Sequence, residues 1–135
     1  MGAVLDIDPR PILIVDDDAE CCAALARLLD RHGFVVDTVA SASSALARCG
    51  EDMPALVILE LMLPHMDGEQ FLERYLERWS DTAAPVLLLS ASATRETVAA
   101  RLGLAGSLPK PFDADELVKL VGDIMRFVSP PPTSP

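Results

Sequence analysis

The chain has 135 residues, 50% of them hydrophobic, and a formal net charge of −10 at pH 7. A single domain of this size buries roughly two-thirds of its unfolded surface, so we expect a packed core and not disorder. The acidic balance argues against nucleic-acid backbones and anionic membranes as partners. No apolar run approaches the ~18 residues of a membrane span and no signal peptide opens the chain, which predicts a cytoplasmic protein.

Two strands and two helices are predicted in the first fifty residues. After a leader at residues 1–11, the apolar run 12–15 predicts a buried strand that ends in three aspartates. Apolar residues then recur at helical spacing from Ala19 until a glycine that suits a helix C-terminus. Residues 34–39 alternate like a strand near a sheet edge, and a short helix begins near Ser41.

The second half of the chain continues this alternation. The run 55–59 has no polar break, which predicts a strand covered on both faces. Asp67 and Gln70 have the spacing of a capping box and predict the start of the next helix. The remaining predicted elements are a strand at 85–90, a weaker helix at 94–102, a short strand within 103–109, a helix from Asp113 to Val128 and a proline-rich tail or linker at 129–135.

Five β-α units in succession predict one α/β domain at residues 12–128, with a doubly wound parallel sheet covered by helices on both faces. Such a sheet brings the carboxyl ends of its strands to one crevice. The side chains that follow those ends are Asp16, Asp17, Glu60, Ser90 and Lys110.

Three carboxylates in one crevice would repel one another by about 1–4 kcal/mol per pair at ~4 Å. The Lys110 ammonium and a Mg²⁺ ion would relieve this repulsion, since Mg²⁺ prefers hard oxygen ligands. A hydroxyl such as Ser90 and an ammonium opposite an acid also suit the oxygens of a phosphoryl group. The three cysteines have neither disulfide nor metal-ligand spacing, and we interpret them as small buried helix residues in a reducing compartment.

Four motifs, ILIVDDD, VILELMLPHMDG, LLLSAS and LPKPF, resemble the receiver domain of two-component response regulators from about Ile12 to Val128. The resemblance implies a CheY-like, flavodoxin-like (βα)5 fold with strand order 2-1-3-4-5. It also implies a signalling module that is not an enzyme and acts by binding proteins. Residues 94–128 would form the contact surface for a sensor kinase, an output domain, another receiver or a second copy of the chain.

The family's roles transfer to single residues of this sequence. Asp16 and Asp17 resemble the metal-site acids, with Asp17 the direct ligand, and the residue-60 carboxylate and the Met62 carbonyl would complete the set. Ser90 and Lys110 resemble the side chains that contact the phosphoryl group. The Lys110-Pro111 peptide bond is expected to be cis, as in family members.

The sequence departs from the family at two positions. Glu60 stands where receivers carry the phosphoacceptor aspartate, and its extra methylene moves the carboxylate by roughly 1 Å, enough to disturb in-line transfer. Our hypothesis is that Glu60 is not phosphorylated efficiently, partly mimics the phosphorylated state and, by pairing with Lys110, weakens the need for Mg²⁺. Ser107 stands where receivers usually carry a switch aromatic, which predicts an altered switch or, alternatively, neutral drift.

Three other readings stay open. Glutamate is a common engineered substitute for phospho-aspartate, so the chain could be an ordinary receiver in which Glu60 is a phosphomimetic substitution. A small Mg²⁺-dependent phosphatase would use a similar strand-end acid, but it would need a second acid where Met62 stands. A flavodoxin-like carrier would need a phosphate-binding loop after the first strand, where this chain has acids that repel a flavin phosphate.

Overall fold

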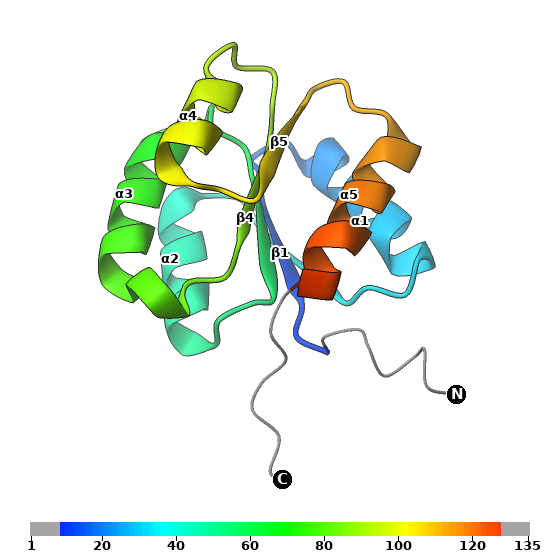
Figure 1. The fold of residues 1–135 in the computed structure, drawn as a ribbon, viewed down its shortest axis with the longest axis horizontal. Helices are drawn as coiled ribbons and strands as arrows, with labels where there is room; N and C mark the ends of the chain where they lie inside the picture. The colour runs from blue at the N-terminus through cyan, green and yellow to red at the C-terminus, as the bar shows by residue number, and fades with distance from the viewer. Residues whose placement is uncertain (1–8, 128–135) are drawn as a thin grey trace, which may run out of the picture.

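The computed structural model describes residues 9–127, in which strands and helices alternate as expected (Figure 1). The predicted leader and tail lie largely outside these residues. The elements in chain order are β1 (Ile12–Val15), α1 (Ala19–Arg31), β2 (Val36–Val39), α2 (Ala42–Glu51), β3 (Leu56–Leu59), α3 (Gly68–Trp79), the 3-10 turn η2 (Ser80–Thr82), β4 (Val86–Ser90), α4 (Arg95–Leu102), β5 (Gly106–Pro109) and α5 (Ala114–Phe127).

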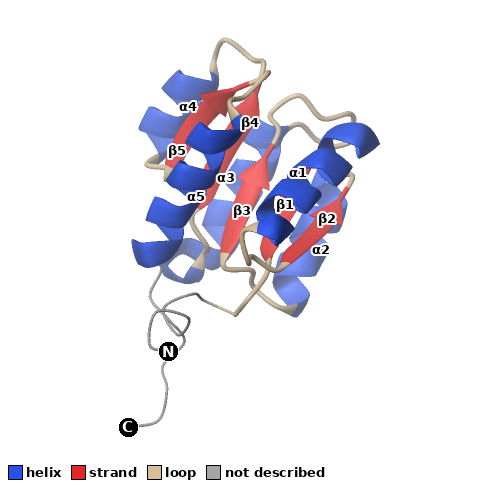
Figure 2. Cartoon of the chain, turned by 90° about the vertical axis from the view of Figure 1, so that its right-hand side faces the viewer, coloured by secondary structure: helices blue, strands red, loops and turns tan. Residues whose placement is uncertain are grey.

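The five strands form one parallel sheet in the order β2-β1-β3-β4-β5, which confirms the predicted fold (Figure 2). In the register of the sheet Val15 pairs with Leu59, and Leu59 pairs with Leu88. β1 and β3 therefore end at the same level, and β4 continues two residues further, to Ser90. Whatever follows them is gathered at one edge of the sheet.

Alternation along the central strands divides the core into two clusters, one on each face of the sheet. On one face Leu13 and Val15 pack with apolar side chains of α2, α3 and α4, whereas Ile12 and Ile14 pack on the other face with those of α1 and α5. All residues of β1, β3 and β4 are buried. Burying each large aliphatic side chain contributes about 1.5–3 kcal/mol, so the central strands form a rigid base for the residues that follow them.

The capping box predicted at the start of α3 is present, and two other helix ends are also capped. Asp67 and Gln70 make both halves of the capping box at the start of α3. Ser41 accepts from the Ser44 N–H and caps α2. Gly103 ends α4 in the left-handed conformation at φ 64°, which costs glycine no steric strain.

Some details differ from the sequence-based expectations. The second strand begins at Val36 and not at Phe34, because the Phe34 N–H still bonds to the end of α1 and Val35 is 57% exposed. The turn η2 was not predicted. Cys22 and Cys49 are buried as expected, whereas Cys21 is partly exposed. Within residues 9–127 no helix is long and apolar enough to cross a membrane.

Candidate functional site

Two acids lie side by side at the carboxyl edge of the sheet. Asp16 directly follows β1 and Glu60 directly follows β3, and the Glu60 N–H donates to the Val15 carbonyl at 3.0 Å. Each of the two acids is only 5% exposed. Two carboxylates in such a position need a counter-charge, because burial and their mutual repulsion both oppose ionisation.

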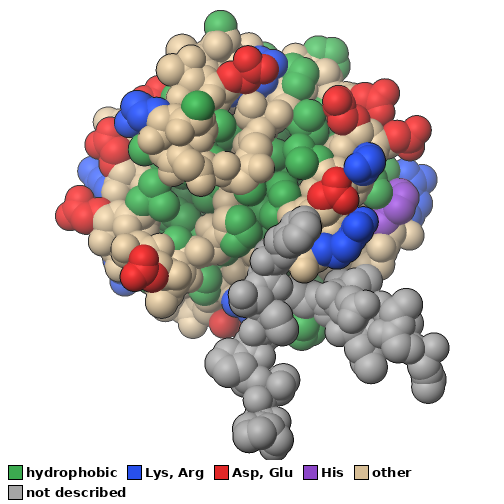
Figure 3. Space-filling view, viewed as in Figure 1, with side chains coloured by type: hydrophobic (Ala, Val, Ile, Leu, Met, Phe, Trp, Pro, Cys, Tyr) green, Lys and Arg blue, Asp and Glu red, His purple; other side chains and the backbone are tan. Residues whose placement is uncertain are grey.

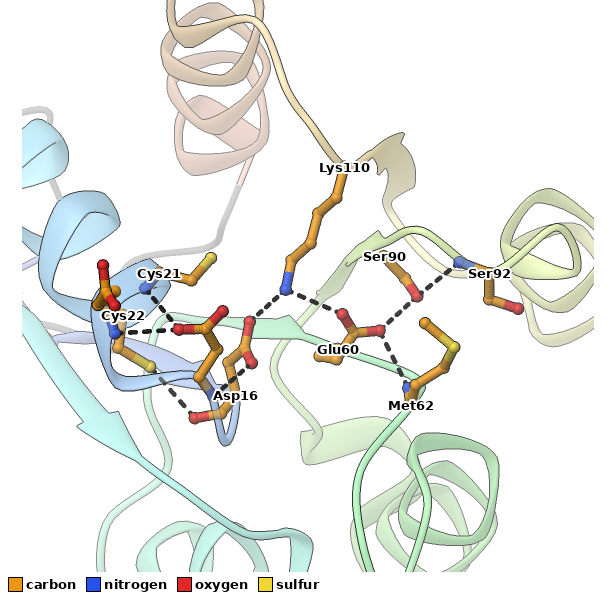
Figure 4. Close-up of polar contacts among 10 residues, drawn as sticks. Asp16, Cys21, Cys22, Glu60, Met62, Ser90, Ser92 and Lys110 are labelled. Carbon is orange, nitrogen blue, oxygen red and sulfur yellow. Dashed lines mark hydrogen bonds and ion pairs between the residues drawn. The ribbon is translucent and has the colours of Figure 1, made fainter.

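Lys110 supplies that charge from the end of β5. Its Nζ lies 2.5 Å from Asp16 Oδ2 and 2.9 Å from Glu60 Oε1 (Figure 4). The Lys110 backbone N–H donates to the Ser90 carbonyl at 3.2 Å, and the Lys110-Pro111 bond is cis as predicted. Burial acts to lower the pKa of Lys110, but the hydrogen bonds to Asp16 and Glu60 outweigh it and raise the pKa above its usual value. Lys110 is therefore a permanent cation in this site.

The second oxygen of Glu60 is bound as well. Oε2 accepts from the Ser90 hydroxyl and, at 3.0 Å, from the Met62 N–H. Burial acts to raise the pKa of Glu60, but the hydrogen bonds from Ser90, Met62 and Lys110 together lower it. Both carboxylate oxygens of Glu60 thus have donors, and the carboxylate is held in its charged form.

The loop that carries Glu60 is shaped by a close backbone approach. The Gly68 N–H donates to the Leu61 carbonyl at 2.8 Å. A Cβ on Gly68 would lie 2.6 Å from Leu61 Cα and 2.8 Å from the Glu60 carbonyl oxygen. Only glycine fits between α3 and this loop, so Gly68 helps to fix the direction in which Glu60 points.

Asp16 is held by α1 in ways that the sequence reading missed. Its Oδ1 accepts from the Asp18 N–H at 3.0 Å, and its backbone carbonyl accepts from the Cys22 thiol at 3.2 Å. Burial raises the pKa of Cys22 to about 11, so the thiol keeps the proton that it donates. Asp18 also caps α1, and an aspartate directly before a helical pattern was the available signal for that role.

The predicted metal ligands are only partly brought together. Asp17 is exposed, and no hydrogen bond or ion pair is found for its side chain within residues 9–127. In that same range no group of three or more His, Cys, Asp or Glu side chains is arranged to hold a metal ion. The inner oxygens of Asp16 and Glu60 already face the Lys110 ammonium, so these residues fit a lysine better than a resident ion. The Mg²⁺ site stays a prediction.

The loop between β4 and α4 contains a second group of contacts that the sequence reading missed. The Ser92 N–H donates to the Ser90 hydroxyl at 3.1 Å, and the Ser92 hydroxyl pairs with the Thr94 hydroxyl at 2.8 Å. The only signal was a pair of hydroxyl residues, Ser92 and Thr94, separated by one alanine and following a strand-end serine. Ser107, the predicted switch position, is half-buried on β5 opposite Leu88 and lies outside these contacts.

Known proteins resemble this chain over most of its described length. The family model of the response regulator receiver domain matches residues 12–122. The response regulator Rre1 of Synechocystis is 34% identical over 121 residues, covering 87% of this chain and 52% of that protein. The phosphate regulon transcriptional regulatory protein PhoB of Escherichia coli is 34% identical over 124 residues, covering 90% of this chain and 54% of that protein. The chain thus spans about half the length of these relatives.

Solved structures give the same result. A putative response regulator from Chloroflexus aurantiacus superposes with a TM-score of 0.79 at 29% identity, covering 87% of this chain and 98% of that one. The receiver domain of NtrX from Brucella abortus superposes with a TM-score of 0.78 at 28% identity, covering 86% and 98% of the two chains. Receiver domains are signalling modules and not typical enzymes.

Proposed function

Because this chain belongs to the response regulator receiver domain family, we propose that it signals by binding other proteins without ordinary phosphorylation of residue 60. The observation that carries the proposal is the set of donors around Glu60. Lys110 binds one carboxylate oxygen, and Ser90 and the Met62 N–H bind the other. These donors are the groups that would otherwise receive the oxygens of an incoming phosphoryl group.

Phosphoryl transfer to residue 60 would require Glu60 to leave this arrangement. The carboxylate would have to give up its bonds to Ser90 and Lys110 while still attacking in line, and a misplacement of about 1 Å can cost a 100-fold loss of rate. The depressed pKa of Glu60 also reflects a carboxylate that is stabilised in place. The side chain therefore acts as an internal substitute for a phosphorylated aspartate, and Lys110 takes the place of much of the charge that Mg²⁺ would supply.

We further propose that partners bind the face formed by α4, β5 and α5, at about residues 94–128. These three elements lie together on one side of the molecule (Figure 1), and apolar side chains gather over that side (Figure 3). A sensor kinase, an output domain, another receiver or a second copy of this chain would dock there. The net charge of −10 favours protein partners over nucleic acid.

Intact-mass spectrometry after incubation with Mg²⁺ and acetyl phosphate tests the proposal. Transfer would give an acyl phosphate on the protein and release acetate. We expect no adduct on the given sequence and an adduct on the Glu60→Asp variant, in which the shorter acid withdraws from Ser90 and Lys110. Glu60→Gln, which has no nucleophilic carboxylate, reports labelling elsewhere in the chain.

Each other outcome contradicts part of the proposal. An adduct on the given chain that maps to Glu60 would show a working receiver and refute phosphorylation-independent signalling. If neither chain is labelled, the pocket as a whole is incompetent and Glu60 is not what blocks it. Labelling of the aspartate variant alone is the expected result and supports the proposal, whether Glu60 is natural or was introduced.

A further inference from the structure

Position 107, where receivers usually carry the switch aromatic, is a serine in this protein and has no ring to move. Ser107 pairs in register with Leu88, and Leu88 belongs to the core cluster that includes Val98 and Ala99 of α4. Ser107 therefore lies on the sheet face that α4 covers, where its small hydroxyl side chain fills little of the space between β5 and α4. Any link between the acidic pocket and α4 must use other atoms.

A set of hydrogen bonds joins the pocket to the start of α4, and Figure 4 shows its first part, from Glu60 through Ser90 to Ser92. Glu60 accepts from the Ser90 hydroxyl, whose oxygen accepts from the Ser92 N–H at 3.1 Å. The Ser92 hydroxyl then accepts from the Thr94 N–H at 3.2 Å and pairs with the Thr94 hydroxyl at 2.8 Å. We call this path from Glu60 through Ser90 and Ser92 to Thr94 the hydroxyl ladder.

The ladder sets the orientation of the Ser90 hydroxyl. A serine hydroxyl has one proton to donate and lone pairs that accept. Because the Ser92 N–H occupies an acceptor position on Ser90 Oγ, the Ser90 proton is free to point at Glu60. A displacement of the residue-60 carboxylate therefore disturbs Ser90 first and the Ser92 main chain next.

The start of α4 depends on this ladder more than an ordinary helix start would. Thr94 is the N-cap, but its side chain makes no capping bond to α4 and is turned toward Ser92 instead. The Arg95 N–H also returns to the Ser92 carbonyl, at 3.4 Å. The buried residues of α4, Val98 and Ala99, lie after its first turn, so packing on the sheet does little to hold that first turn in place.

We propose that Ser92 is a positioning residue that couples the state of the residue-60 carboxylate to the N-terminus of α4, in place of an aromatic switch at position 107. This inference rests on the proposed function, because it describes how the signal of that pocket reaches the partner-binding face. With Glu60 bound to Ser90 and Lys110, the ladder holds α4 in one position. Loss of the residue-60 carboxylate, or of the Ser92 hydroxyl, releases the first turn of α4.

Amide hydrogen exchange across residues 95–102 tests this coupling in a double-mutant cycle of Glu60→Ala and Ser92→Ala. The Ser92→Ala variant keeps the N–H that binds Ser90 but loses the hydroxyl that binds Thr94. We expect each single variant to speed α4 exchange roughly 5- to 30-fold, as the loss of about one hydrogen bond predicts. The double variant should exchange no faster than Ser92→Ala alone, and Ser92→Thr should restore the protection of α4.

Two further variants keep the test decisive. Ser90→Ala replaces Glu60→Ala in the cycle if the latter fails to fold, because it breaks the same ladder at its next member. Ser41→Ala is the matched control, since it removes a serine cap from α2 and should speed exchange in α2 alone, whatever stands at position 60.

Additive effects of the pocket and Ser92 variants would overturn the proposal, because they would mean that Ser92 supports the start of α4 independently of the pocket. Unchanged α4 exchange in Glu60→Ala or Ser90→Ala would overturn it too. A phosphoryl adduct on Glu60 in mass spectrometry would refute the proposed function. The hydrogen-exchange cycle tests only the coupling through Ser92, so the two proposals can fail separately.

Discussion

Replacing Lys110 with methionine should destabilise the protein more than the loss of one exposed lysine would. The lysine side chain is 20% exposed and touches two acids whose side chains are each 6% exposed. The Lys110→Met variant keeps a similar apolar stem but leaves Asp16 and Glu60 as adjacent buried carboxylates without their counter-charge. Breaking a buried ion pair in this way costs about 3–5 kcal/mol at neutral pH.

The loss should depend on pH with a definite sign. The pKa of Glu60 is lowered in the folded protein, so its stabilisation is present above the pKa of an unfolded glutamate and is lost as the pH falls through the lower folded value. In Lys110→Met the two carboxylates repel, and uptake of one proton relieves them. The difference in unfolding free energy between the protein with Lys110 and the Lys110→Met variant should therefore shrink as the pH is lowered from about 7 to about 5.

Urea unfolding followed by circular dichroism at the two pH values measures this difference. Lys119→Met is the matched control, because Lys119 is exposed on α5 and pairs with Asp123 at 3.1 Å one helical turn away. Such a pair contributes about 0.5 kcal/mol or less. The reasoning is refuted if Lys110→Met loses no more stability than Lys119→Met, or if its deficit grows on acidification.

Three other predictions follow from single contacts. Gly68→Ala should lower the free energy of unfolding in urea by about 1–3 kcal/mol, because the new Cβ would lie 2.6 Å from Leu61 Cα. The control is Gly122→Ala on α5, whose Cβ meets nothing within 4 Å and which should be neutral or stabilising. Equal effects of the two variants would contradict this prediction. Tyr75→Phe should cost about 1–2 kcal/mol, because the buried hydroxyl donates to a carbonyl at 2.8 Å, and an unchanged midpoint would disprove it. Mg²⁺ should raise the melting temperature of Lys110→Met more than that of the protein with Lys110, because Asp16 and Glu60 then lack a cation. An equal shift in both proteins would count against this prediction.

Much of the fold was predictable because local signals and burial agree. The uninterrupted apolar runs of β1 and β3 are what a strand covered on both faces requires, and the capping residues mark the helix starts. The start of β2 was predicted two residues early. Phe34 and Val35 are apolar, but Gly33 at φ 89° turns the chain there and Val35 faces solvent.

The site was predictable only in part. Parallel strands bring their carboxyl ends together, so the meeting of Asp16, Glu60, Ser90 and Lys110 followed from topology alone. The hydroxyl ladder did not, because a serine in a loop bonds to whichever main-chain group the loop conformation presents. The exposure of Asp17 could not be predicted from the sequence for a similar reason. The chain leaves the strand at this point and no longer alternates between two buried faces.

The direction of the chain through the fold has a practical consequence for attaching other molecules. β1 begins, and α5 ends, at the amino end of the sheet, whereas Glu60 and Lys110 lie at the opposite end (Figures 1 and 2). A fluorophore, a tether or a fused domain joined to either end of the domain is therefore separated from the pocket by the full length of the strands. Labelled or immobilised forms of this protein should keep the pocket and the start of α4 accessible to solvent and to partners.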